Sequence, residues 1–134
     1  MGNFYDDNAD LRWYLETGID WEPVIRLTEY DWKAEDAPES VEEAVEIYRD
    51  LLDLIGTVVA DEIAPRWHEL DQAHSVLKDG EVIIAPVVEE VFTQLGELGF
   101  FGLSLPRELG GMNAPLLVFQ MAAELLARRW LGKK

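Results

Sequence analysis

Four residues with metal-binding or acid–base side chains, His68, Glu69, Asp71 and His74, lie within seven positions of one another. Imidazole and carboxylate groups are common zinc ligands, and a structural zinc site needs four ligands in a tetrahedron. The spacing here matches neither the H-E-x-x-H pair of metalloproteases nor a zinc finger. The chain also has no cysteine, which excludes thiolate sites, disulfides and a cysteine nucleophile. We therefore predict no metal site.

The same histidines lack the partners that acid–base catalysis requires. A catalytic histidine needs a nucleophile and an orienting group nearby, and the sequence shows neither. The chain also contains no glycine-rich phosphate loop of the G-x-G-x-x-G or P-loop type. We predict no catalytic, cofactor-binding or metal-binding residue, and expect residues 68–74 to be solvated at a frayed helix end. A small enzyme in its own right is the least favoured interpretation.

Length and composition favour one folded domain, because the chain has 134 residues and 49% of them are hydrophobic. The formal net charge of −16 is unevenly distributed. Residues 1–62 hold 18 acidic and four basic residues, whereas residues 63–134 hold nine and seven. Acidic surface repels phosphate groups, so we expect no nucleic-acid partner and no docking on anionic membranes. We interpret the charge as a solvated surface.

Membrane and secretion signals are not evident in the sequence. No stretch has the roughly 20 consecutive apolar residues that span a bilayer. The amino terminus, from Met1 to Asp7, is acidic and has no apolar signal region. We expect a cytoplasmic protein.

Residues 1–39 are predicted to form an acidic arm with two short helices. The first is expected over residues 8–17, with Asn8 or Asp10 as its cap and Gly18 as its stop. The second follows directly and has a proline in its first turn.

Aromatic side chains are spread through this arm and admit two interpretations. They could surround a ligand, but aromatic residues in an extension more often anchor it to the surface of the main domain, which we favour. The residues concerned are Trp13, Trp21, Tyr30 and Trp32.

The sequence pattern over residues 40–129 predicts an all-α fold in which three long helices pack antiparallel. The first is expected over residues 40–64, because Ser40 and Glu43 form a capping box before an apolar-periodic run. Pro65 is expected to end or kink this helix.

A hairpin and two further helices complete the predicted bundle. Asp-Gly in the middle of residues 76–84 favours a two-residue turn between short strands that lean on the helices, with an irregular loop as the alternative. The second helix is expected over residues 86–98, with Gly99 as a left-handed carboxyl-terminal cap. The third is expected over residues 114–129, with Asn113 as its cap and a proline in its first turn.

The third helix is apolar on almost all sides, since from Leu116 to Ala127 only Gln120 and Glu124 are polar. Monomers rarely leave large apolar patches open to water. We therefore predict a homodimer or larger assembly, since a copy of the chain is the simplest cover. A folded-back arm is the other possible cover. The predicted contact residues are Leu117, Phe119, Met121 and Leu125 or their neighbours.

The segment Gly99-Phe100-Phe101-Gly102, followed by Pro106-Arg107-Glu108-Leu109-Gly110-Gly111 and a long apolar helix, resembles the N-terminal helical domain of the acyl-CoA dehydrogenases. The layout is similar over residues 41–128, although only residues 99–128 are distinctive. Residues 130–134 form a basic tail that departs from the family pattern.

In that family a flavin accepts hydride from the acyl β-carbon while a glutamate removes the α-proton. The resemblance implies that the flavin and the base belong to domains this sequence does not match, so FAD is implied for a full-length relative and none for this chain. Glu108, within the matched motif, is interpreted as structural.

The resemblance leads to two functional hypotheses. The first is a truncated chain: the isolated N-terminal domain of an FAD-dependent enzyme for acyl-CoA α,β-dehydrogenation. Such a domain would serve packing and oligomerisation, would be inactive alone, and would have as partners the missing dehydrogenase domains. The alternative is a stand-alone helical module for protein interactions.

Overall fold

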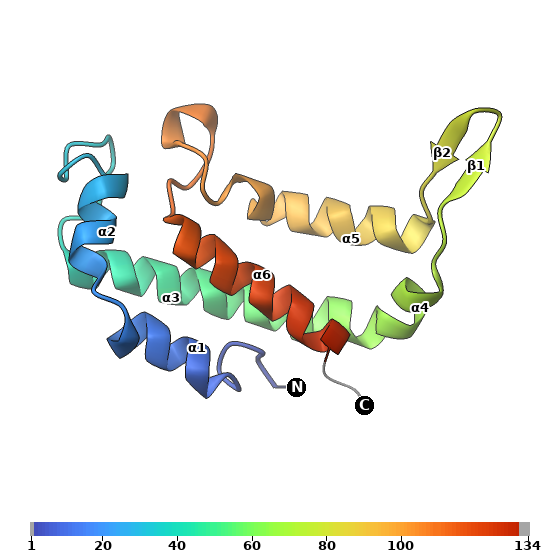
Figure 1. The fold of residues 1–134 in the computed structure, drawn as a ribbon, viewed down its shortest axis with the longest axis horizontal. Helices are drawn as coiled ribbons and strands as arrows, with labels where there is room; N and C mark the ends of the chain where they lie inside the picture. The colour runs from blue at the N-terminus through green and yellow to red at the C-terminus, as the bar shows by residue number, and fades with distance from the viewer. Residues whose placement is uncertain (1, 132–134) are drawn as a thin grey trace.

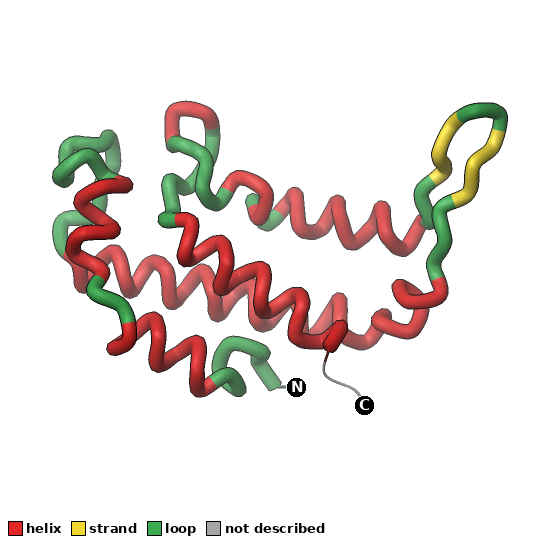
Figure 2. The backbone as a smooth tube through the Cα atoms, viewed as in Figure 1, coloured by secondary structure: helices red, strands yellow, loops and turns green. Residues whose placement is uncertain are grey.

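The computed structural model describes residues 2–131, with side chains up to residue 128, and is mainly helical, as predicted (Figures 1 and 2). No helix in these residues is both long and apolar enough to cross a membrane. The helices are α1 (Ala9–Trp13), α2 (Trp21–Thr28), α3 (Val41–Val58), α4 (Trp67–Gln72), α5 (Pro86–Glu97) and α6 (Leu116–Leu131), and the strands are β1 (Val76–Lys78) and β2 (Glu81–Ile83).

The long helices α3, α5 and α6 alternate in direction along the chain, so α3 and α6 are parallel (Figure 1). These two helices lie side by side. The α1 helix lies along this central pair on one side, α5 lies on the other, and α2 stands at the end where α3 begins (Figure 1). The predicted capping box at Ser40 and the predicted left-handed cap at Gly99 are both confirmed. Ser40 Oγ accepts the Glu43 amide at 3.1 Å, while the Glu43 carboxylate accepts the amide of Glu39. Gly99 has a left-handed φ of 73°.

Pro65 does not end the first long helix. A π-helical turn (Val59–Ile63) and a 3₁₀ turn (Ala64–Arg66) connect α3 to α4, so the backbone stays helical from Val41 to Gln72. Proline has no amide to donate, and its ring clashes with the carbonyl four residues back in a regular α-helix. The wider turn before it and the tighter turn around it change the hydrogen-bond register, which removes that conflict.

The predicted cap of the third helix is wrong. The α6 helix begins at Leu116, and the Pro115 carbonyl accepts the Val118 amide at 2.9 Å. Asn113 instead has a φ of 54°, and its Nδ2 donates to the Thr28 carbonyl at 3.1 Å. The side chain that sequence reasoning assigned to the helix start therefore ties the preceding turn to the amino-terminal arm.

The hairpin has the predicted turn but not the predicted environment. Asp79 and Gly80 have φ values of 52° and 83°, as a primed turn requires, and Leu77 pairs with Val82. All six strand residues are exposed, and Leu77 is 73% exposed. The expectation that the hairpin leans on the helices is therefore wrong: it projects from the end of the bundle (Figure 1).

The amino-terminal arm is part of the core rather than a surface attachment. Trp21 is buried and donates from Nε1 to the Leu15 carbonyl at 2.7 Å, whereas Trp13 and Tyr30 are exposed and Trp32 is half-buried. The aromatic anchors are thus only partly as expected. Five buried arm residues join the same hydrophobic cluster as α3 and α6: Tyr5, Leu11, Leu15, Trp21 and Ile25.

The amino-terminal arm lies beside the face of α6 that the sequence predicted to be a contact between copies of the chain. Met121 and Leu125 of α6 are buried within the protomer, Phe119 is half-buried, and Leu117 is exposed. Asn8, at the start of α1, donates to Glu124 Oε1 of α6 at 3.4 Å. A contact between copies through Met121 and Leu125 would therefore require the arm to move or α6 to be exchanged, because both side chains are buried within the protomer.

Candidate functional site

The acidic and imidazole side chains of residues 68–74 are not gathered into a site. His68 stacks on Trp67 with ring centroids 3.9 Å apart, and His74 lies exposed beyond the end of α4. Across residues 2–131 there is no group of three or more His, Asp or Glu side chains placed to hold a metal ion. The assignment of no catalytic residue stays a prediction.

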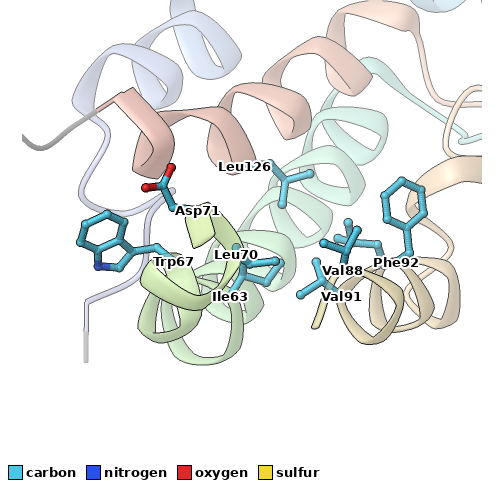
Figure 3. Close-up of a pocket in the computed structure, with 9 residues that line it drawn as sticks. Ile63, Trp67, Leu70, Asp71, Val88, Val91, Phe92 and Leu126 are labelled. Carbon is cyan, nitrogen blue, oxygen red and sulfur yellow. The ribbon is translucent and has the colours of Figure 1, made fainter. Parts of the chain in front are cut away.

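An open groove of about 360 Å³ lies between the long first helix, α5 and α6 (Figure 3). Its apolar side chains come from elements far apart in the sequence: Ile63 and Leu70 point toward Val88 and Val91, with Leu126 of α6 beside them (Figure 3). Trp67, Phe92 and Leu95 complete the apolar lining, and Asp71 is its one charged residue.

Polar contacts connect α5 to the long helical segment that contains Ile63 and Leu70. Gln94 of α5 donates to Glu62 Oε2 at 2.8 Å, and Arg66 donates from Nη2 to Glu90 Oε2 at 2.6 Å. Glu69 approaches the same guanidinium at 3.7 Å. The hydrogen bond with Glu90 raises the pKa of Arg66 further above its usual value. These contacts fix α5 beside the long helix and leave the apolar faces of both helices lining the groove.

The lining of the groove does not fit a flavin dinucleotide. Its pyrophosphate requires free cations or a group of backbone amides, commonly at a helix amino terminus. The groove offers one charged side chain, the carboxylate of Asp71, which repels phosphate. Arg66 is paired with Glu90, and Arg107 is paired with Glu29. No chemical step is therefore derived through a flavin on this chain.

A second site joins the arm to the turn that precedes α6. Arg107 donates from Nη1 and Nη2 to the two carboxylate oxygens of Glu29 at 2.7 and 2.8 Å, and also from Nη1 to the Glu35 carbonyl at 3.2 Å. The hydrogen bonds with Glu29 raise the pKa of Arg107 further above its usual value. Tyr48 is buried and is affected by the charge of Glu29. Burial is the larger cause and the Glu29 charge the next, and together they raise the pKa of Tyr48 to about 12.

Glu108 was expected to hold the turn before α6, and Arg107 is the residue that does so. Glu108 is exposed and makes no side-chain hydrogen bond within the described chain, whereas Arg107 anchors the turn. Sequence reasoning missed Glu29 because nothing distinguishes it among the 18 acidic residues of positions 1–62. Arg107 lay within the quoted motif, and its place beside the paired glycines was the available signal.

Comparison with known families gives one match. A family model described as "Acyl-CoA dehydrogenase, N-terminal domain" matches residues 46–133. The match begins within α3, continues through α6 and extends into the basic tail, while the arm lies outside it. Comparisons with curated proteins and with solved structures gave no match.

Proposed function

Because the chain belongs to the acyl-CoA dehydrogenase N-terminal domain family, we propose that it is a non-catalytic helical domain that packs against the other domains of a flavoenzyme. The parent reaction would be α,β-dehydrogenation of an acyl-CoA. FAD would supply the hydride acceptor, and another domain would hold both the flavin and the base that removes the α-proton.

The observation that carries this proposal is the open apolar groove. Val91 and Leu95 are buried at its base, but Phe92 remains 58% exposed and Ile63, Leu70 and Leu126 are only partly covered. Apolar side chains left open beside a formed core are typical of a surface that another protein segment covers. In the proposed enzyme this domain would therefore contribute shape and exclude water, and its residues would move no proton.

A complementation experiment tests the proposal. The purified chain is mixed with a flavin-loaded segment of an acyl-CoA dehydrogenase that lacks its own N-terminal helical domain, and acyl-CoA-dependent dye reduction is measured. We expect activity only in the mixture, and no change in flavin fluorescence when FAD is titrated into the chain alone. Saturable FAD binding at micromolar concentration, or acyl-CoA oxidation by the chain with free FAD, would contradict the proposal.

The Phe92→Asp variant makes the experiment specific to the groove. It should lose complementation, because it places a charge where an apolar contact is required. Leu27→Asp is the matched control: it adds the same charge at a more exposed apolar residue on α2, and should retain complementation. A wild-type chain that forms no complex would instead favour the stand-alone interaction module.

A further inference from the structure

Left-handed backbone is concentrated in the two loops that the Glu29–Arg107 ion pair joins. Among the described residues other than glycine, six have a positive φ, and five of these lie in the loops after α2 and before α6. A side chain other than hydrogen has a free-energy cost in this conformation, because its Cβ approaches the following carbonyl oxygen. Such strain persists only where the surrounding structure enforces it. The five residues are Tyr30, Asp31, Trp32, Asp36 and Asn113.

Three of these residues are consecutive and form the turn between α2 and α3. Tyr30, Asp31 and Trp32 have φ values of 50°, 56° and 65°. Residues other than glycine normally adopt this conformation singly. Aspartate tolerates it because its short side chain can form local hydrogen bonds, an option that tyrosine and tryptophan lack. Residues 30–32 are therefore a strained hinge between the arm and the bundle.

Hydrogen bonds that converge on Glu29 hold the hinge in this conformation. The Glu29 carbonyl accepts the amides of Lys33 and Ala34 at 2.9 and 3.1 Å. Its carboxylate accepts two hydrogen bonds from Arg107, which also donates to the Glu35 carbonyl beyond the hinge at 3.2 Å. One guanidinium therefore connects both sides of the hinge to the turn before α6.

The other side-chain hydrogen bond between these loops in the described chain is weaker. It runs from Asn113 to the Thr28 carbonyl at 3.1 Å and involves no charge. Charge-assisted hydrogen bonds are roughly twice as strong as neutral ones, and a paired arginine forms two of them. The Glu29–Arg107 pair is therefore the main restraint on the hinge.

We propose that the arm is a strap with a strained hinge, and that the Glu29–Arg107 pair is its clasp. While the clasp is formed, residues 30–32 stay left-handed and the arm lies on α6. When the clasp opens, the hinge relaxes to ordinary backbone and the arm moves away. This device is separate from the groove and does not depend on the proposed packing role.

Opening of the strap has a defined consequence at α6. Met121 and Leu125 are 7% and 0% exposed, and they belong to the same hydrophobic cluster as Leu11 and Leu15 of the arm. Movement of the arm uncovers these α6 side chains, which a contact between copies through them requires. The clasp therefore controls whether this face of α6 is available.

Paired substitutions at Tyr30 test for strain in the hinge. Tyr30 is 68% exposed, so Tyr30→Ala and Tyr30→Gly remove the same side-chain contacts, but only glycine relieves the left-handed backbone. Thermal unfolding followed by circular dichroism should place the melting temperature of Tyr30→Gly about 3 °C above that of Tyr30→Ala. An equal or lower melting temperature for Tyr30→Gly would show that the hinge stores no strain.

The same two substitutions in an Arg107→Lys background test the clasp. Lysine keeps the positive charge but not the two parallel donors, so the chain should fold with a weakened clasp. The difference in melting temperature between Tyr30→Gly and Tyr30→Ala should then shrink, because a relaxed hinge is no longer left-handed. An unchanged difference would show that the ion pair does not hold the hinge, and would overturn the proposal.

Local measurements distinguish a released strap from general destabilisation. In Arg107→Lys, hydrogen exchange of the α1 and α2 amides should be at least ~10-fold faster than in the parent, while that of α5 should be unchanged. Oxidation of Met121 by peroxide should also be faster, with Met112, which is 40% exposed, as the internal control. Equal acceleration of exchange in all the helices, or oxidation of Met121 at the parent rate, would contradict the strap.

Discussion

Glu29 and Arg107 form a two-hydrogen-bond ion pair that joins the amino-terminal arm to the family-matched domain. The pair connects residues 78 positions apart in sequence, with N–O distances of 2.7 and 2.8 Å. The Glu29 side chain is 1% exposed, whereas that of Arg107 is 26% exposed. A buried carboxylate is tolerated only with a counter-charge and hydrogen bonds, so the arm depends on the turn that Arg107 occupies.

Replacing Arg107 should destabilise the fold more than replacing its neighbour. Arg107→Ala leaves the Glu29 carboxylate buried without a partner, and we expect a loss of about 3 kcal/mol in the free energy of unfolding. Glu108 is exposed, so Glu108→Ala should change stability by less than about 0.5 kcal/mol. Urea unfolding followed by circular dichroism measures both. Equal effects would show that the ion pair does not hold the arm.

Tyr48 predicts a loss of stability at alkaline pH. Burial raises its pKa from 10.0 to about 12, so the folded state keeps the phenol proton longer than the unfolded state does. The contribution of Tyr48 to the free energy of unfolding is therefore complete below pH 10. It falls by about 1.4 kcal/mol per pH unit as the pH rises from 10 to 12. The decline in the free energy of unfolding between these values should be smaller in Tyr48→Phe. At neutral pH this variant should be nearly neutral, because the Tyr48 hydroxyl has no hydrogen-bond partner among the described residues.

Two helical glycines should respond oppositely to alanine. A Cβ on Gly56 of α3 would lie 2.7 Å from the Tyr5 amide, so Gly56→Ala should displace the arm and destabilise the protein. No atom of the described part of the chain outside the helix backbone lies within 4 Å of the corresponding position on Gly96 of α5, so Gly96→Ala should stabilise by about 0.5–1 kcal/mol. Thermal unfolding of both variants measures the difference. A stabilising Gly56→Ala would show that the arm does not lie on α3.

The full chain should be a monomer at tens of micromolar, because the arm covers the α6 residues Met121 and Leu125. Sedimentation velocity should show one species of 15.3 kDa. A chain that starts at residue 40 loses this cover and should self-associate or unfold. A full-chain dimer dispersed by Leu117→Asp would show that α6 remains an interface after all.

Local sequence signals predicted the parts of the fold that depend on adjacent residues. Ser40 with Glu43, the Asp79-Gly80 turn and the left-handed Gly99 each rely on backbone preferences within a few positions. The apolar repeat similarly predicted the long helices, because period alone distinguishes a helix from a strand.

The features that sequence reasoning missed depend on contacts between distant segments. Asn113 was a suitable cap by type, but the Thr28 carbonyl lies within its reach only in the folded chain. Glu29 resembles every other acidic residue until Arg107 is placed beside it. Phe92 belongs to the apolar repeat of α5, yet its side chain stacks on Phe101 and stays 58% exposed. The groove therefore could not be predicted from helix periodicity.

The most direct test of the packing role is sedimentation of the chain with a flavin-loaded dehydrogenase segment that lacks its N-terminal helical domain, followed at the visible absorption band of the flavin. The account predicts that the flavin band moves to a larger species when the chain is added, and that Leu27→Asp preserves this shift while Phe92→Asp abolishes it. A flavin band that sediments identically with and without the chain would contradict the central claim.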